Sequence, residues 1–458
     1  MKIFDLKPTA ENVLDTYLSD SMGRNTFVFQ VVELLNSIEG SCSVALEGKW
    51  GSGKTFFVKQ VELVLNANNE FTSVLTSEEK DQVKKAQSAY FKPDRVLKPF
   101  VSVYYDAWEN DNDDDPILSL VYAIMQKVST DYSFVDRDYL TAGTAVLDSF
   151  LETKWTEVID SLKGDDPLSN IRKNKNIEEK VNDFLSSLLP ERGERLVVFI
   201  DELDRCSPNY AIRLLERIKH YFENESITFI FSVNINELQY TVKKYYGEEF
   251  DGARYLDRFF DLRLQLPEAN LSRYYGQLNF SSRDYTWSVM CDAMIRTYHM
   301  EPRTISRYLQ LYRLAVGNHL EQMEKAGRHF TDASRYYCLM YVAPIMIALK
   351  LVDPKKYYDF IEGRDSLPLI SASCYLLDGF FFNLLALDEN FEPVVSNPEI
   401  KVVTKEEKLQ AMYEALFVTD YNLDIESKRI GKTRFGKDSR DLVMGVVSLL
   451  SQYARYDD

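Results

Sequence analysis

A glycine-rich segment near the start of the chain carries residue types that suit the binding of phosphate. It fits the pattern GxxxxGK[ST], and we expect all of it to line the site: Gly48, Lys49, Trp50, Gly51, Ser52, Gly53, Lys54 and Thr55. Glycines let backbone N–H groups turn toward phosphate oxygens, and the start of a following helix adds the positive end of its dipole. The Lys54 ammonium should contact the β- and γ-phosphates of a nucleotide, and the Thr55 hydroxyl should coordinate Mg²⁺.

Acidic residues follow an apolar run, Leu196–Ile200, later in the chain. An acid at the carboxyl end of a buried strand lies where ligands bind an α/β sheet. We therefore expect Asp201 to hold the Mg²⁺ ion, through water, and Glu202 to orient or deprotonate an attacking water. Asp204 competes with Glu202 for the role of base. An acid pair that suits water favours hydrolysis over transfer to a second substrate.

A polar residue also ends the apolar run Ile227–Val233. Asn234 at that point could contact the γ-phosphate or the attacking water, as a sensor of the bound nucleotide. Ser232 is the alternative for this role. An asparagine that only begins a loop would be the plainer interpretation.

The elements that must position these residues show as short apolar runs. Besides the two runs already named, strands are expected at Ser43–Glu47, Leu97–Ala107 and Phe260–Leu266, and a helix at Lys54–Asn66. Continuous apolar strands separated by helical patterns indicate a buried parallel sheet with right-handed crossovers. The predicted fold class is therefore α/β, a P-loop NTPase core with a parallel sheet.

The pattern divides the chain into a core at residues 1–270 and a helical region at residues 271–458. In the core, Asn68–Lys92 is polar and reads as an insertion, and a helical insertion without strand signals is expected at about 112–192. After Pro267 the strand pattern ends, so we expect a helical lid and C-terminal domain. An aromatic stripe in that region should be core: Tyr336, Tyr337, Met340 and Tyr341.

The composition sets limits on the compartment and on partners. The chain has 458 residues, is 45% apolar and carries a net charge of −17, which disfavours nonspecific binding to nucleic acid or anionic membrane. The N-terminus has no signal-peptide pattern, Cys338–Val352 is short for a membrane span, and Leu367–Leu387 carries Asp378 and Gly379. The five cysteines and four histidines form no metal-binding spacing. We expect a cytoplasmic protein with no zinc and no membrane attachment.

Five segments, in this order, resemble the KAP family of P-loop NTPases. They are GKWGSGKT (Gly48–Thr55), VYYDAWEND (Val103–Asp111), VVFIDELDRCSP (Val197–Pro208), ARYLDRFFDLRLQLP (Ala253–Pro267) and EPRTISRYL (Glu301–Leu309), which together cover about residues 20–315. The resemblance implies an ATPase of the additional-strand class, related to AAA+ and STAND proteins, with sheet order 5-1-4-3-2. It implies ATP rather than GTP, and it suggests bacterial roles in phage defence or plasmid-borne exclusion, usually with a partner protein.

The chain departs from this family in two respects. Many members carry transmembrane helices between the P-loop and the Walker B strand, but Pro116–Pro190 is not apolar enough for them, so membrane attachment is not carried over. Members commonly have Asp after the first Walker B acid, whereas this chain has Glu202, which is more similar to the AAA+ acid pair. That difference favours hydrolysis.

Arginines in two of these segments resemble AAA+ positions. Arg258 resembles an arginine finger that reaches the γ-phosphate of a neighbouring subunit, and Arg303 or Arg307 resembles the sensor arginine of a lid. Guanidinium groups spread positive charge over the transferring phosphoryl oxygens. The alternative is a surface arginine paired with an acid such as Asp257 or Glu301.

A basic segment, Lys428–Arg440, contrasts with the acidic chain. Its cations are Lys428, Arg429, Lys432, Arg434, Lys437 and Arg440. Such a segment could bind nucleic-acid phosphates, dock on an acidic surface of a partner or of the chain, or form a solvated loop. The opposite case, the acidic run Asp111–Asp115, is expected to be a loop and helix start.

Taken together, the residues and the resemblance predict an ATP-binding and ATP-hydrolysing protein that requires Mg²⁺. We expect a homo-oligomer that acts as a switch or motor and controls a partner or effector protein. One alternative is a nonhydrolysing scaffold that holds nucleotide. Another is a small-molecule kinase, although the sequence shows no compact acceptor site.

Overall fold

The computed structural model describes residues 7–90, 97–113, 115–132, 142, 145–146, 180–189, 192–222, 224–271, 273–274, 285–325, 333–372, 405–421, 427–430 and 433–453. Most of the insertion expected at about 112–192, and most of Leu367–Leu387, lie outside these residues. The chain forms two compact units, one over Leu6–Gln277 and the other mainly over Leu278–Asp458.

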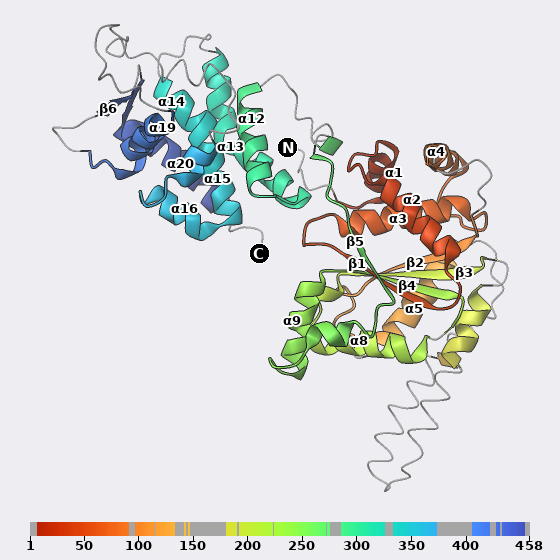
Figure 1. Cartoon of the computed structure of the whole chain (residues 1–458). Coiled ribbons are helices and arrows are strands. Elements are labelled where there is room, and N and C mark those ends of the chain that lie inside the picture. Colours follow the sequence, from red (N-terminus) through yellow and green to blue (C-terminus); the bar gives the residue numbers. More distant parts are fainter. Residues whose placement is uncertain are drawn as a thin grey trace, which may run out of the picture. The chain divides into compact units, whose positions relative to one another are not determined.

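The first unit is built on a five-stranded parallel sheet in which the strands are ordered β2-β3-β4-β1-β5 (Figure 1). The strands are β1 (Cys42–Glu47), β2 (Phe100–Asp106), β3 (Arg195–Asp201), β4 (Ile227–Val233) and β5 (Leu262–Gln265). Read from the other edge, this order is 5-1-4-3-2. The expected α/β fold and its strand order are therefore confirmed.

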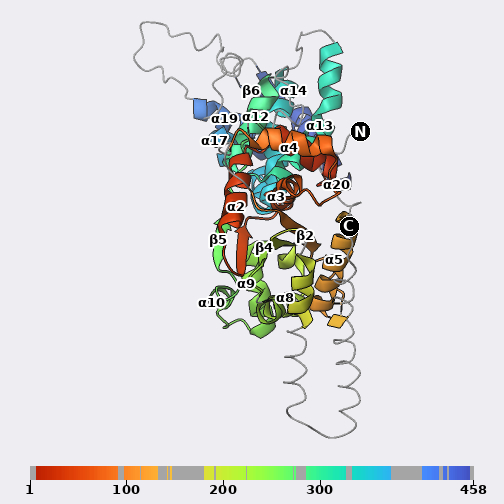
Figure 2. The same ribbon diagram turned by 90° about the vertical axis from the view of Figure 1, so that its right-hand side faces the viewer.

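Helices cover both faces of this sheet, which explains why β3 and β4 are buried along their whole length (Figures 1 and 2). One face packs against α1 (Ala10–Leu18), α2 (Asn25–Ser37), α3 (Lys54–Asn68) and α4 (Ser77–Gln87). The other packs against α5 (Pro116–Asp131), α8 (Pro208–Tyr221) and α9 (Ile235–Tyr246). Successive side chains of a strand alternate between these two cores, so a continuous apolar run serves both.

Local signals set the starts of the covering helices. Asp115 caps α5, where its carboxylate accepts the N–H of Ile117 at 3.0 Å and Pro116 takes the first turn. The helix start expected at the end of Asp111–Asp115 is thereby confirmed, and Asp114 lies outside the described residues. Helix α4, in the polar stretch after α3, begins with a reciprocal capping box between Thr76 and Glu79.

Arg195 links the amino-terminal ends of neighbouring strands of the sheet. Its buried guanidinium donates to the carbonyl oxygens of Ile38 at 3.1 Å and Gly40 at 2.7 Å, and to the hydroxyl of Thr228 at 3.0 Å. These bonds tie the start of β3 to the loop before β1 and to the start of β4. The contact is structural, because the phosphate loop follows the other end of β1.

Arg195→Ala is expected to lower the free energy of unfolding of the first unit by about 2 kcal/mol, because partly buried acceptors lose their donor. Denaturant unfolding, followed by circular dichroism, measures this change. Lys219→Ala, which removes an exposed cation of α8, is the matched control and should change stability little. Equal stability of the two variants would contradict the structural role of Arg195.

The second unit is mostly helical in its described residues. Its helices are α12 (Tyr285–Thr297), α13 (Pro302–Lys325), α14 (Ala333–Tyr337), α15 (Ala343–Val352), α16 (Pro354–Ile361), α17 (Leu367–Ala372), α19 (Lys405–Tyr413) and α20 (Lys437–Tyr453), with π-helical turns η2 (Cys338–Val342) and η5 (Glu414–Val418). The aromatic stripe of α14 and η2 is buried, as expected for core residues.

One stretch of this unit, Ser334–Val352, is long and apolar enough to cross a membrane by length and composition, among the residues that the structure describes. Of its most apolar window, 78% is buried inside the protein. Burial of that extent is typical of a core helix in a globular protein.

A small antiparallel hairpin corrects two expectations for the C-terminal region. Strands β6 (Ser427–Ile430) and β7 (Thr433–Gly436) pair with each other, so this region is not wholly helical, and much of Lys428–Arg440 is not a loop. The alternation of apolar and polar residues that usually marks a strand is hard to see here. Charged residues interrupt both strands, and only Ile430, Thr433 and Phe435 turn toward the interior. The one sequence signal for a hairpin was the two-residue connection, beginning with glycine, between the two short segments that form the strands.

Candidate functional site

The carboxyl-terminal edge of the sheet brings the phosphate loop and the acids together. Glu47, the last residue of β1, pairs with Val233 at the end of β4, and Asp201 at the end of β3 pairs with Ser232. The N–H of Gly48 donates to the carbonyl of Val233 at 3.2 Å, so the loop is tied to the neighbouring strand. Parallel strands end at the same edge, which is why residues distant in sequence meet there.

The backbone of the phosphate loop requires its glycines. Gly51 and Gly53 have φ angles of 77° and 92°, in the region that favours glycine. A side chain on Gly48 would place its Cβ 2.8 Å from the hydroxyl oxygen of Ser52. Helix α3 begins at Lys54, directly after this turn, so its N-terminus faces the loop. The arrangement suits an anion bound by backbone N–H groups.

Lys54 is buried beneath this loop, with 8% of its surface exposed. Its ammonium donates to the carbonyl oxygens of Gly48 at 2.9 Å and Lys49 at 3.4 Å. Burial lowers the pKa of Lys54, and the nearby carboxylates of the acid cluster oppose this shift. The side chain is therefore held within the loop by neutral acceptors and attracted by acids.

Arg24, at the start of α2, braces the loop from the N-terminal side. Its buried guanidinium donates to the carbonyl of Ser52 at 2.8 Å and lies 3.2 Å from the position that a Cβ on Gly53 would take. Sequence reasoning missed this residue, because no motif connects a single arginine to a loop that follows it by 28 residues.

Asp201 is almost fully buried at the end of β3, with 1% of its surface exposed. One carboxylate oxygen accepts the hydroxyl of Tyr104 at 2.9 Å, and the other accepts the N–H of Glu202 at 3.0 Å. Tyr104 lies on β2 and was also missed, although alternation along that strand turns it to the same face as α3. Asp106, which ends β2 and pairs with Asp201 in register, is a further acid at this edge.

Glu202 has a left-handed backbone, with φ 58°, which bends the chain sharply after β3. Its carboxylate lies 2.5 Å from Nε of Arg205, and the Arg205 guanidinium lies 5.6 Å from the ring centre of Trp108. Burial, with a smaller contribution from Asp201, raises the pKa of Glu202 to about 7. A carboxyl group with this pKa can take up and release a proton near neutral pH.

Asp204 connects the phosphate loop to the end of β4. Its Oδ2 accepts the indole N–H of Trp50 at 2.7 Å and the backbone N–H of Asn234 at 3.2 Å. Asn234 precedes α9, and its side chain makes no capping bond to that helix. Ser232, the alternative sensor residue, is fully buried, and its hydroxyl has no partner among the described residues.

The candidate arginines lie apart from this cluster or in the other unit. Arg258 is exposed in the turn before β5, and β5 runs parallel to β1, so Arg258 lies at the sheet end opposite the phosphate loop. Its expected alternative partner, Asp257, instead pairs with Arg263 at 2.5 Å. Arg303 and Arg307 are exposed on α13 of the second unit.

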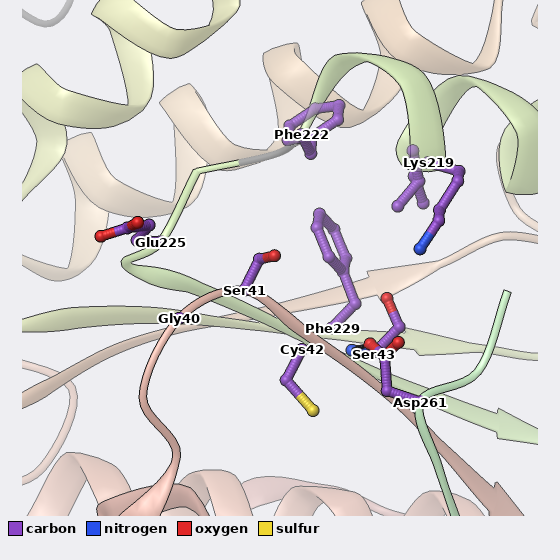
Figure 3. A pocket seen from close by; sticks show the side chains of 10 residues that line it. Gly40, Ser41, Cys42, Ser43, Lys219, Phe222, Glu225, Phe229 and Asp261 are labelled. Carbon is purple, nitrogen blue, oxygen red and sulfur yellow. Dashed lines mark hydrogen bonds between the residues drawn. The ribbon is translucent and has the colours of Figure 1, made fainter.

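A separate cavity of about 430 Å³ lies at the amino-terminal end of β1 (Figure 3). Its lining combines Ser41, Ser43 and Asp261 with two aromatic rings, Phe222 and Phe229. None of the phosphate-loop residues lines it. This cavity is therefore distinct from the cluster at the carboxyl-terminal edge.

Within the described part of the chain, no group of three or more His, Cys, Asp or Glu side chains is placed to hold a metal ion. A magnesium ion bound with a nucleotide does not need such a group, since phosphates and waters supply most of its ligands. The buried Asp201 carboxylate and the Thr55 hydroxyl at the start of α3 are oxygen donors of the kind that Mg²⁺ prefers.

Comparison with known proteins identifies the family. The profile of the KAP family P-loop domain matches residues 24–309. An uncharacterized protein of Methanocaldococcus jannaschii is 32% identical over 83 residues, which are 18% of this chain and 43% of that protein. The structure of the Aeropyrum pernix ORC1 protein in complex with DNA is similar over 94% of both chains, with 13% identity and a TM-score of 0.31.

Proposed function

Because the chain belongs to the KAP family of P-loop NTPases, we propose that it binds ATP with Mg²⁺ and hydrolyses it. The observation that carries the proposal is the meeting of the glycine-rich loop, the buried Lys54 and the acids Asp201 and Glu202 at one sheet edge. A phosphate-binding loop beside a partly buried acid, whose pKa burial raises, suits hydrolysis of a bound triphosphate.

Each residue has a separate task in this proposal. Backbone N–H groups of Gly48–Thr55 bind the phosphates, and Lys54 contacts the β- and γ-phosphates. Thr55 and Asp201 would hold Mg²⁺, which when bound would supply positive charge to the phosphate oxygens. Glu202 accepts a proton from the attacking water. Asn234 contacts the γ-phosphate or that water, after β4.

Glu202→Gln is expected to bind ATP with unchanged affinity and to hydrolyse it at least about a hundredfold more slowly, because an amide cannot act as the base. The measurement is phosphate release at saturating ATP and Mg²⁺, together with a nucleotide titration. Glu237→Gln, on α9, is the control and should behave as the wild type.

Two other outcomes would redirect the assignment. Full turnover in Glu202→Gln, together with loss of turnover in Asp204→Asn, would make Asp204 the base. A wild-type protein that binds ATP and never releases phosphate would favour the nonhydrolysing scaffold. The 2.5 Å contact between Glu202 and Arg205 is the observation that keeps this alternative open, since it engages the carboxylate within the chain.

The biological role that we propose is an oligomerising switch or motor in the cytoplasm that controls a partner or effector protein. Arg258, which is exposed and lies at the sheet end opposite the phosphate loop of its own chain, supports action between copies. A part in bacterial phage defence rests on the family resemblance. Binding of nucleic acid by Lys428–Arg440 rests on four exposed cations of the hairpin and of the first turn of α20: Lys428, Arg429, Arg434 and Lys437.

A further inference from the structure

The two carboxylate oxygens of Asp204 have different surroundings. Oδ2 is held by two donors, the indole of Trp50 at 2.7 Å and the backbone of Asn234 at 3.2 Å. Oδ1 is buried and has no hydrogen-bond partner among the described residues. The whole side chain is nearly enclosed, with 6% of its residue exposed. A buried carboxylate oxygen that accepts no hydrogen bond lowers the stability of the fold. Its presence at this site therefore points to a donor that arrives with a ligand.

The contacts of Asp204 place its carboxylate beside the phosphate loop. Its first donor, Trp50, belongs to the phosphate loop, and its second follows the strand that the loop is tied to. Trp50 is 48% exposed as a residue, while its indole N–H bonds to the nearly enclosed Asp204.

We propose that Asp204 holds the attacking water through Oδ1, and that Trp50 is the positioning residue that aims this carboxylate. The inference rests on the proposed hydrolysis and divides its tasks between two acids. Asp204 accepts a hydrogen bond from the water, while Glu202 takes the proton. The water oxygen then bonds to the γ-phosphorus, and the bond to the β–γ bridging oxygen breaks, which leaves ADP and phosphate.

Two substitutions separate the positioning role of Trp50 from the water-holding role of Asp204. Trp50→Phe keeps an aromatic ring on the loop and removes the N–H that orients Asp204. Asp204→Asn can keep its carbonyl oxygen on the indole, and its amide nitrogen then replaces the free acceptor with a donor. We expect kcat to fall about tenfold in Trp50→Phe and about a hundredfold in Asp204→Asn, with nucleotide affinity unchanged in both.

Tryptophan fluorescence gives a readout that does not depend on turnover. The emission of Trp50, obtained by subtracting the spectrum of Trp50→Phe, should shift in Asp204→Ala and stay nearly unchanged in Asp204→Asn, because only the alanine removes the acceptor. Trp287→Phe, on α12 of the second unit, is the matched control for loss of one tryptophan. It should retain wild-type kcat and the same Trp50 response.

The outcomes distinguish this inference from the proposed function. If the wild type is active, two results would overturn the inference alone. One is an unchanged kcat in Trp50→Phe, and the other is a Trp50 emission spectrum that does not change in Asp204→Ala. A weaker affinity for ATP in Trp50→Phe, with kcat preserved, would make the indole a binding contact and also overturn it. A wild type that binds ATP without turnover would overturn the proposed hydrolysis, and the water-holding role with it.

Discussion

Lys54→Ala is expected to abolish ATP binding while the protein stays folded. The ammonium is the cation buried in the phosphate loop, where it donates to the carbonyls of Gly48 and Lys49 and is attracted by the neighbouring acids. Without it, the β- and γ-phosphates would meet only backbone N–H groups and the acidic cluster. Coulomb repulsion from that cluster is then no longer offset.

The measurement for Lys54→Ala is a titration with a fluorescent ATP analogue, together with denaturant unfolding. Lys85→Ala, an exposed cation on α4, is the matched control and should bind nucleotide as the wild type does. Folding is expected to persist, because among the described residues the ammonium donates to carbonyl oxygens of the loop and to no strand. Near wild-type affinity in Lys54→Ala would reject the phosphate-loop assignment.

Arg258→Ala is expected to retain ATP binding and to lose hydrolysis, by about 10³–10⁵ in rate if the residue acts as an arginine finger. In this structure Arg258 is exposed before β5, whereas the phosphate loop follows β1, whose six residues span roughly 20 Å. An arginine at that end of the sheet suits the site of a neighbouring copy better than its own. Hydrolysis would then depend on assembly.

A mixing experiment tests whether the site is shared. Arg258→Ala and Lys54→Ala proteins are each expected to be inactive, yet a mixture should regain activity, because one type of interface pairs an intact loop with an intact arginine. The ATPase rate is measured against the mixing ratio at fixed total protein. Arg254→Ala, an exposed arginine one turn earlier on α10 (Gly252–Leu256), is the control and should need no complementation.

If the ATPase rate of the mixture never exceeds the sum of the rates of the two variants alone, at any mixing ratio, the site is not shared between copies. Arg258 would then be interpreted as a surface residue with an intramolecular task. The ion pair between Asp257 and Arg263 favours the arginine-finger role, because Asp257 then does not engage Arg258.

The sequence by itself determined the parts of this protein that depend on neighbouring residues. Five apolar runs located the five strands, and β4 has the expected bounds, Ile227–Val233. The glycine spacing in Gly48–Thr55 predicted the phosphate loop. The positive φ angles of Gly51 and Gly53, and the close approach of Ser52 to Gly48, explain why side chains are excluded at these positions. The order of the strands came only from the family resemblance, since local patterns carry no information on which strands pair.

The tertiary structure alone decided which side chains meet at the site. Trp50 and Asp204 are 154 residues apart, and Tyr104 and Asp201 are 97 apart, yet each pair is joined by a hydrogen bond. The same packing engages Glu202 with Arg205 and leaves one oxygen of Asp204 without a hydrogen-bond partner among the described residues. Sequence reasoning ranked these acids by position alone. Their hydrogen-bond partners, and so their separate tasks, follow from chain segments that only the folded sheet brings to one edge.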